Sequence, residues 1–215
     1  MEFDGQVFVS RQLFNEPDCF DCRRDFDFGH FIEMEVNKTR AFIAIDFPPE
    51  IIKEIARIQN ILKKKQFTGK TTELENLHLT LKFLGEISLP TLEKVKEELS
   101  KIKLKKFEAS PGEAGTFSYR KKPRIVWIKI NGKEIFELQL AVDLAMEKCG
   151  FVKEERFMSH LTLARVKYVK SPGDFIEYVK NLSVREFKFE VEGFKLMKSE
   201  LKSIGPVYET LKTYK

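Results

Sequence analysis

Two of the three histidines in the chain lie in the same tetrapeptide, which occurs as His78-Leu-Thr80-Leu and as His160-Leu-Thr162-Leu. On a β-strand, residues two positions apart project from one face, so each histidine shares a face with its threonine. Imidazole titrates near neutral pH, so one histidine can accept a proton while the other donates one. The threonine hydroxyls can donate hydrogen bonds to phosphate oxygens as negative charge grows on them. The two pairs predict metal-independent acid–base chemistry at one phosphorus atom, with His78 and His160 as catalytic residues.

The tetrapeptide is informative because it occurs twice in corresponding places. A single His-x-Thr on an amphipathic strand is usually a polar pair on a solvated face. Here Arg40 precedes His78 by 38 positions, and Arg124 precedes His160 by 36 positions. The near-equal spacing indicates a duplicated unit with one His-Thr pair in each copy.

Both copies are predicted to contain the same order of elements. Each opens with a β-branched and aromatic strand, continues with a helix of apolar residues at helical spacing, and then reaches the histidine strand. A second helix and an extended segment close the unit. The predicted ranges are 40–47, 49–65, 77–84, 90–102 and 107–119 in the first unit, and 124–130, 134–149, 160–169, 172–182 and 187–201 in the second.

This order predicts an α+β fold of two pseudo-symmetric lobes that face each other across a central cleft. Each lobe is expected to be an antiparallel or mixed sheet with outer helices, and the long connections favour crossovers over hairpins. The domain is predicted to cover residues 39–215, with repeat halves at about 39–119 and 123–201. Residues 1–38 are interpreted as an extension outside it.

The paired motifs carry a resemblance to a known superfamily. The stretches from His78 to Gly85 and from His160 to Arg165 resemble the signatures of the 2H phosphoesterases, and most closely those of the archaeal and bacterial 2′-5′ RNA ligase family, also called RNA 2′,3′-cyclic phosphodiesterases. The opening at Arg40 and the closing segment around Tyr208 are similar to that family as well.

The resemblance implies hydrolysis of RNA 2′,3′-cyclic phosphate ends, tRNA fragments among them, to 2′-phosphomonoesters. It implies no metal or other cofactor, and in some members ATP-independent, reversible 2′-5′ joining of RNA ends. Carried over residue by residue, it gives His78 and His160 as catalytic residues and Thr80, Thr162 and Arg165 as substrate-binding residues. Because the two motifs are so alike, the sequence does not assign the acid and the base.

Charge and length are consistent with this interpretation. The 215 residues carry a net charge of +5, but residues 1–38 hold nine acidic and four basic side chains, so the remainder holds 34 basic and 24 acidic ones. A core that basic favours an anionic partner such as nucleic acid, although a solvated Lys/Glu-rich surface explains it equally well. No apolar run reaches membrane-spanning length, and no secretory signal opens the chain. We expect a cytoplasmic monomer with no membrane partner.

Several other residues carry weaker predictions. Arg40 and Arg124 are interpreted as surface residues at strand ends, and Phe83 as a core residue in preference to a base-stacking one. Tyr208 and Ser199 are cleft candidates by family analogy alone. The stretch from Phe67 to Thr71 ends like a phosphate-binding loop but lacks its first glycine, so nucleotide binding there is rejected.

The first residues are the least explained. A zinc site would need four ligands, and this segment offers three candidates, Cys19, Cys22 and His30, so a zinc site is not the favoured interpretation. An alternative hypothesis is that translation starts at Met34 and that the residues before it are an extension outside the family domain.

Two other functions stay open at this point. One is a phosphodiesterase for a small cyclic or 2′-linked nucleotide. The other is a non-catalytic module that binds RNA or a nucleotide, which would not require two titrating groups.

Overall fold

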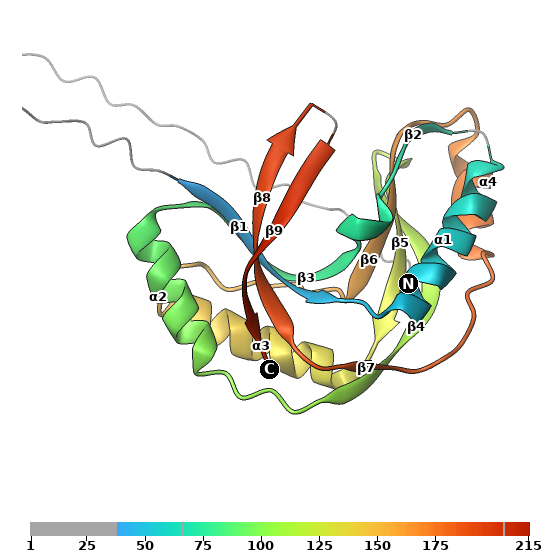
Figure 1. The fold of residues 1–215 in the computed structure, drawn as a ribbon. Coiled ribbons are helices and arrows are strands. Elements are labelled where there is room, and N and C mark those ends of the chain that lie inside the picture. The colour runs from blue at the N-terminus through green and yellow to red at the C-terminus, as the bar shows by residue number, and fades with distance from the viewer. Residues whose placement is uncertain (1–37, 66, 204) are drawn as a thin grey trace, which may run out of the picture.

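The computed structural model describes residues 38–65, 67–203 and 205–215. Two antiparallel sheets lie side by side with helices on their outer faces (Figure 1), which confirms the predicted α+β fold of two lobes. The first sheet has the order β3 (His78–Ile87), β1 (Thr39–Asp46), β8 (Phe194–Lys202), β9 (Gly205–Tyr214). The second sheet has the order β2 (Thr68–Thr71), β6 (His160–Tyr168), β5 (Lys122–Asn131), β4 (Phe107–Tyr119), β7 (Phe189–Val191).

In the described part of the chain, four helices cover the two sheets and bury apolar stripes against them. They are α1 (Pro49–Lys63), α2 (Leu89–Ser100), α3 (Lys133–Glu147) and α4 (Pro172–Lys180), and a single 3-10 turn, η1 (Leu74–Asn76), precedes β3. Helices α2 and α3 cover the first sheet, whereas α1 and α4 cover the second. In α1, Ile51, Ile55, Ile58 and Leu62 recur at helical spacing and are fully buried. No helix in the described part of the chain is long and apolar enough to cross a membrane.

The lobes are not simply the two halves of the chain, because each half contributes to both. Strand β4 comes from the first half but pairs with β5 in the second sheet. Strand β8 returns from the second half to pair with β1 in the first sheet, and β9 pairs with β8 at its edge. The helix that follows β1 packs on the second sheet, and the helix that follows β5 packs on the first. This exchange makes the two lobes one interlocked unit.

Two connections differ from the expected crossovers. Strands β4 and β5 form a hairpin whose turn places Arg120 and Lys121 at φ 49° and 61°, and β8 and β9 form a second hairpin. The first turn contains no glycine, so two non-glycine residues adopt the left-handed conformation there. The expectation of crossovers concerned the long connections of each unit, and these two short connections are hairpins.

Strands β2 and β9 were not predicted. Strand β2 comprises Thr68–Thr71, within the stretch that ends like a phosphate-binding loop, and it pairs with β6 at the edge of the second sheet. A Cβ on Gly69 would lie 2.2 Å from the carbonyl oxygen of Arg165, so glycine permits this close approach. The segment is thus an edge strand followed by a 3-10 turn.

The N-terminal predictions cannot be placed on this fold. Cys19, Cys22, His30 and Met34 all lie outside the described residues, as does the predicted extension apart from Lys38.

Candidate active site

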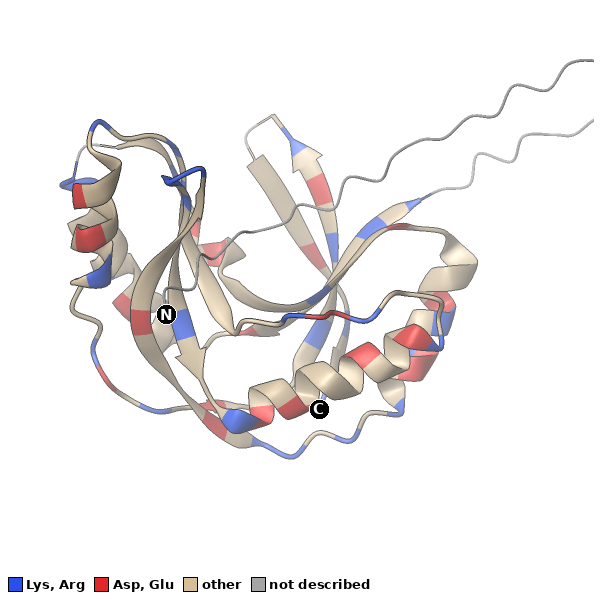
Figure 2. Cartoon of the chain, turned by 180° about the vertical axis from the view of Figure 1, so that it is seen from behind, with Lys and Arg blue, Asp and Glu red and all other residues tan. Residues whose placement is uncertain are grey.

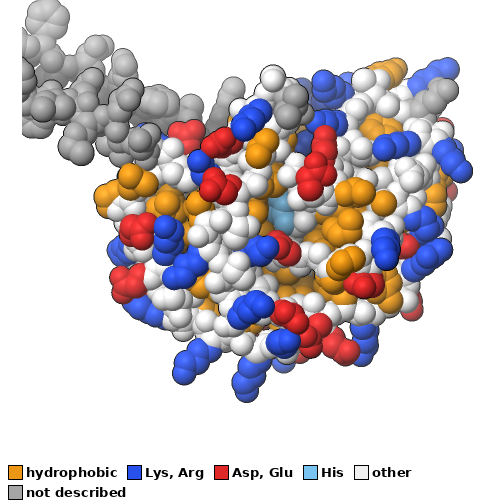
Figure 3. All heavy atoms as spheres, viewed as in Figure 1, with side chains coloured by type: hydrophobic (Ala, Val, Ile, Leu, Met, Phe, Trp, Pro, Cys, Tyr) orange, Lys and Arg blue, Asp and Glu red, His pale blue; other side chains and the backbone are white. Residues whose placement is uncertain are grey.

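Both histidines begin a strand beside the boundary between the lobes, His78 on β3 and His160 on β6, and these strands contact each other. The leucines between and after the motif residues are buried, with Leu79, Leu161 and Leu163 showing no exposed surface, while the histidines and threonines are half-buried. The predicted division of each strand into a core face and a polar face is therefore confirmed. Figure 3 shows a histidine ring (pale blue) recessed between the lobes.

A β-bulge follows each motif at the same place. In β3 the pairing with β1 skips Leu81, and in β6 the pairing with β5 skips Leu163. One extra residue reverses the alternation of faces, so the residue five positions after each histidine returns to the histidine's face. These residues are Phe83 and Arg165, which a regular strand would turn into the core. The bulge explains how Arg165 can belong to the site.

The two histidines are held in the same orientation. Nδ1 of His78 lies 2.8 Å from the carbonyl oxygen of Asn76, and Nδ1 of His160 lies 2.8 Å from that of Met158. A carbonyl oxygen only accepts hydrogen bonds, so Nδ1 donates in both rings and carries the proton of the neutral form. Nε2 is then the atom of each ring that can exchange a proton with a substrate.

Burial lowers the pKa of His78 below its ordinary value of about 6.5. The hydrogen bond to Asn76 and the carboxylate of Asp46 oppose this shift, whereas the positive charges of Arg165 and His160 add to it. Strands β3 and β6 contact each other, so Arg165 and His160 on β6 lie close enough for their charges to act on the His78 ring on β3.

Burial also lowers the pKa of His160, and its hydrogen bond to Met158 opposes the shift. Both rings therefore favour the neutral form near pH 7 in the unliganded protein. An anionic phosphate bound between them would raise both pKa values, because it favours the imidazolium form. The site can thus gain a proton as it gains a substrate.

Aromatic side chains support each imidazole, but more of them surround His78. Phe42 and Tyr208 lie 4.8 Å and 5.2 Å from the His78 ring, centroid to centroid, and the two also contact each other. In the second lobe Phe117 lies edge-on to His160 at 5.0 Å. Tyr208, a cleft candidate by analogy, thus contacts the His78 ring, and burial raises the pKa of its phenol.

Phe83 corrects one prediction from the sequence. Its side chain is 69% exposed, so its assignment to the core is wrong. The bulge at Leu81 is the physical reason, since it moves Phe83 to the polar face of β3. Arg40 and Arg124 are exposed as predicted, and a guanidinium nitrogen of Arg124 donates to the carbonyl oxygen of Lys167 at 3.3 Å.

Buried polar side chains brace the two bulges from the helix side. Beneath β3, the ammonium of Lys82 binds the carboxylate of Asp143 on α3 and donates to the carbonyl oxygen of Val152 at 2.8 Å. Beneath β6, the side-chain amide of Gln59 on α1 donates to the carbonyl oxygens of Thr72 and Leu163, at 2.8 Å and 3.0 Å. Sequence reasoning missed both braces, although a lysine in an otherwise apolar strand was a visible signal.

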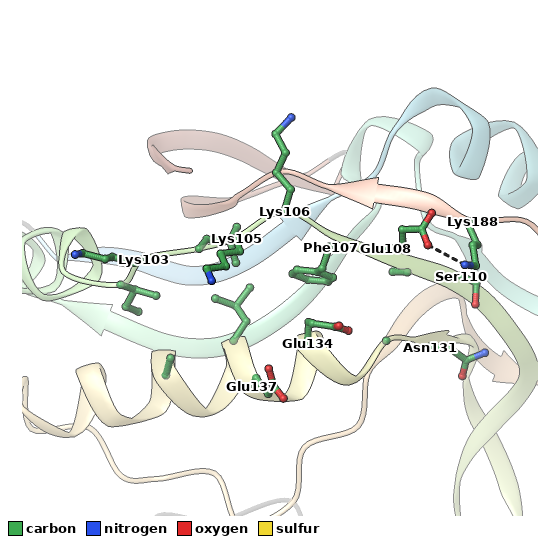
Figure 4. Close-up of a pocket in the computed structure, with 16 residues that line it drawn as sticks. Lys103, Lys105, Lys106, Phe107, Glu108, Ser110, Asn131, Glu134, Glu137 and Lys188 are labelled. Carbon is green, nitrogen blue, oxygen red and sulfur yellow. Dashed lines mark hydrogen bonds and ion pairs between the residues drawn. The ribbon is translucent and has the colours of Figure 1, made fainter.

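A groove of about 780 Å³ lies away from the histidines, between the α2–β4 linker and the start of α3 (Figure 4). Lys103, Lys105 and Lys106 line one side of it, and Glu134 and Glu137 line the other. It contains neither motif. Within the described residues no group of three or more His, Cys, Asp or Glu side chains is arranged to hold a metal ion.

Comparison with known proteins places the chain among phosphoesterases. Residues 45–127 and 129–208 match the family described as LigT like Phosphoesterase. An RNA 2′,3′-cyclic phosphodiesterase of Methanocaldococcus jannaschii is 38% identical over 186 residues, covering 81% of this chain and 99% of the relative. A protein of that name from Archaeoglobus fulgidus is 34% identical over 179 residues, covering 81% and 99%.

Solved structures share the fold. The protein TT0787 of Thermus thermophilus superposes with a TM-score of 0.65 at 26% identity, covering 81% of this chain and 96% of that one. Escherichia coli LigT complexed with 3′-AMP gives a TM-score of 0.65 at 24% identity, covering 83% and 98%.

Proposed function

The chain belongs to the LigT-like phosphoesterase family, and from this premise we propose that it is an RNA 2′,3′-cyclic phosphodiesterase that hydrolyses cyclic phosphate ends to 2′-phosphomonoesters. The observation that carries the mechanism is the matched orientation of His78 and His160, each with Nδ1 donating to a backbone carbonyl and Nε2 left for the substrate. Relatives that bear this enzyme name support the substrate class.

In the proposed reaction the cyclic phosphate lies between the two Nε2 atoms. The neutral histidine takes a proton from water as the water oxygen attacks phosphorus, and the bond from phosphorus to the ribose 3′ oxygen breaks. The protonated histidine gives its proton to that departing oxygen, so the product keeps its phosphate on the 2′ oxygen. Each histidine exchanges one proton, and no metal ion takes part in the proposed steps.

Thr80, Thr162 and Arg165 stabilise the phosphate in this proposal. The threonine hydroxyls donate to the non-bridging oxygens, and Arg165 supplies a positive charge that acts at the position of His78. Replacing the attacking water by the 5′ hydroxyl of another RNA would give a 2′-5′ linkage without ATP, because the cyclic ester already contains the bond that is exchanged. Ligation is therefore the same chemistry with a different nucleophile. The cytoplasmic location, the monomeric state and tRNA fragments as natural substrates stay predictions.

The test follows a short RNA that ends in a 2′,3′-cyclic phosphate, in the presence of EDTA. We expect turnover by the wild type, a loss of about 10²-fold or more in His78→Ala and in His160→Ala, and a 2′-phosphate product. Asn60→Ala, on α1 and away from both motifs, serves as the control. Turnover that is unchanged in both histidine variants would contradict the mechanism.

A further inference from the structure

The second sheet has one end that is strongly basic. None of the residues 55–72, 114–133 and 156–173 is Asp or Glu, and these three segments contain β2, β5 and β6. They meet where β6 ends, because Thr68 pairs with Tyr168, Tyr119 pairs with Lys122, and Arg124 donates to Lys167. We call Tyr119, Lys121, Lys122, Arg124, Lys167 and Tyr168 the basic end of the sheet. Lys and Arg positions (blue) lie together at this end of the sheet in the ribbon view from behind (Figure 2), and blue side chains gather on this side of the space-filling view (Figure 3).

The described residues do not neutralise the cations at this end. Among the described residues, Lys121, Lys122, Arg124 and Lys167 form no ion pair with a carboxylate. At the opposite end of the same sheet, Lys106 binds Glu190 and Glu192, at 3.1 Å and 2.9 Å. Lys188 binds Glu108 there at 2.8 Å. The unpaired positive charge at the basic end indicates an anionic partner on that side.

Exposed aromatic rings accompany these cations. Tyr119 and Tyr168 are 52% and 64% exposed, and the guanidinium of Arg120 lies 5.2 Å from the centre of the Tyr119 ring. A basic surface with exposed aromatic rings is what single-stranded nucleic acid binds, through its phosphates and its stacked bases.

The basic end is continuous with the candidate active site. Arg165 lies on the face of His160 and Thr162, and Lys167 follows two residues later on the same face. From His160 to Tyr168 the strand rises about 25 Å, which is too long for a single nucleotide. A cyclic phosphate between the histidines would thus leave the basic end to the nucleotides that precede it.

We propose that the basic end binds the single-stranded RNA segment on the 5′ side of the cyclic phosphate, so that the preferred substrate is an oligonucleotide and not a small cyclic nucleotide. This inference rests on the proposed function, which it extends from the reacting phosphate to the body of the substrate. The surface acts on binding and leaves the chemical step to the two motifs.

The experiment compares two substrates and two matched variants of the full chain. The substrates are a 12-nucleotide single-stranded RNA and a dinucleotide, both ending in a 2′,3′-cyclic phosphate. The test variant is Lys121→Gln/Lys122→Gln/Lys167→Gln. The control is Lys94→Gln/Lys103→Gln/Lys105→Gln, which removes the same charge from exposed lysines on the side of α2 and the groove of Figure 4.

We expect the test variant to raise KM for the 12-nucleotide RNA about tenfold, with kcat within twofold of the wild type, and to leave dinucleotide kinetics unchanged. The slope of log affinity against log salt should become shallower by about 2, because three phosphate contacts are lost. Tyr168→Ala should also raise KM for the longer RNA alone, by about tenfold, through loss of stacking. The control should match the wild type on both substrates.

Two results would overturn the inference while leaving the proposed function intact. One is an equal rise in KM with the control variant, and the other is unchanged KM for the longer RNA in the test variant. If the wild type turned over neither substrate, the proposed function would fail instead. Fluorescence anisotropy with the labelled 12-nucleotide RNA would then still test whether the basic end binds RNA. Weaker binding by the test variant alone would support the inference, and equal binding by both variants would refute it.

Discussion

The two His-Thr motifs are nearly identical in geometry but differ in what surrounds them. In each motif, the Nδ1 atom of the histidine donates a hydrogen bond to the backbone carbonyl oxygen two residues before it, and a bulge occurs at the same position of the strand. Around His78 lie two aromatic rings and a carboxylate, whereas Phe117 is the one aromatic ring found against His160 among the described residues.

The difference indicates which features the proposed chemistry requires. Tautomer, strand face and bulge are the same in both halves, as the proposed mechanism requires of two histidines that present Nε2 to one phosphate. The braces and nearby charges have diverged, because different side chains can hold a strand in the same place. The comparison of the two motifs can be tested in three places: the buried side chains behind the bulges, the two threonines, and the residues that pair with the histidines.

The largest expected effect concerns the braces under the bulges. Lys82→Met would leave the carboxylate of Asp143 buried without its cation, which costs about 3–5 kcal/mol in the free energy of unfolding. Gln59→Leu removes only neutral hydrogen bonds, and the Leu163 carbonyl oxygen still accepts one from the backbone amide of Thr72 at 2.9 Å. We therefore expect this variant to lose about 1–3 kcal/mol in the free energy of unfolding. Urea unfolding measures both.

A paired substitution is the control for this comparison. Lys82→Met/Asp143→Leu removes both charges, so it should recover part of the loss seen in Lys82→Met. If Lys82→Met destabilised the protein no more than Gln59→Leu, the ion pair would not be the stronger brace, and the proposed contrast between the lobes would be broken.

The next effect tests whether the two threonines act alike. Thr80→Val and Thr162→Val keep the shape of the side chain but remove the hydroxyl donor, so each should lower kcat by about 10²-fold with little change in KM. Thr80→Ser and Thr162→Ser retain a hydroxyl and should stay close to the wild type. Turnover of the cyclic phosphate RNA under EDTA gives both constants. A loss confined to one valine variant would mean that the phosphate is held from one lobe only.

Much of this architecture can be predicted from the sequence, because hydrophobic periodicity indicates the elements. The repeated tetrapeptide indicates the candidate site, whose catalytic role stays a prediction. The strands of both motifs and all four helices lie where the pattern predicted them, within a few residues. The bulges were not readable, since a strand with one extra residue has no distinctive composition. Phe83 was therefore assigned to the wrong face, and β2 was missed because a short polar edge strand carries no apolar alternation.

The exchange of elements between lobes was also beyond the sequence. Local patterns predict which residues form a strand or helix but do not state which sheet it joins. Asp46 shows the consequence for the site, because its position beside His78 follows from the pairing of β1 with β3 and from no motif. The corresponding partner of His160 is Lys129 on β5.

The smallest expected effect uses this last difference to separate the histidines. The carboxylate of Asp46 raises the pKa of His78, so Asp46→Asn should lower that pKa further and leave the pKa of His160 unchanged. Lys129→Gln, at the matching position of the other lobe, should move neither. NMR titration of the three histidines measures the shifts, with His78→Ala and His160→Ala to assign the signals. An unchanged His78 pKa would contradict the predicted role of Asp46.

The same variant also distinguishes the roles of the two rings. A lower pKa makes His78 lose its proton at a lower pH. If His78 is the general acid, the alkaline limb of the plot of kcat/KM against pH shifts to lower pH, and activity at pH 7 falls. If His78 is the general base, the acidic limb shifts to lower pH instead, and activity below the pH optimum rises. The direction of movement would therefore assign the proton donor in a site whose two motifs are otherwise alike.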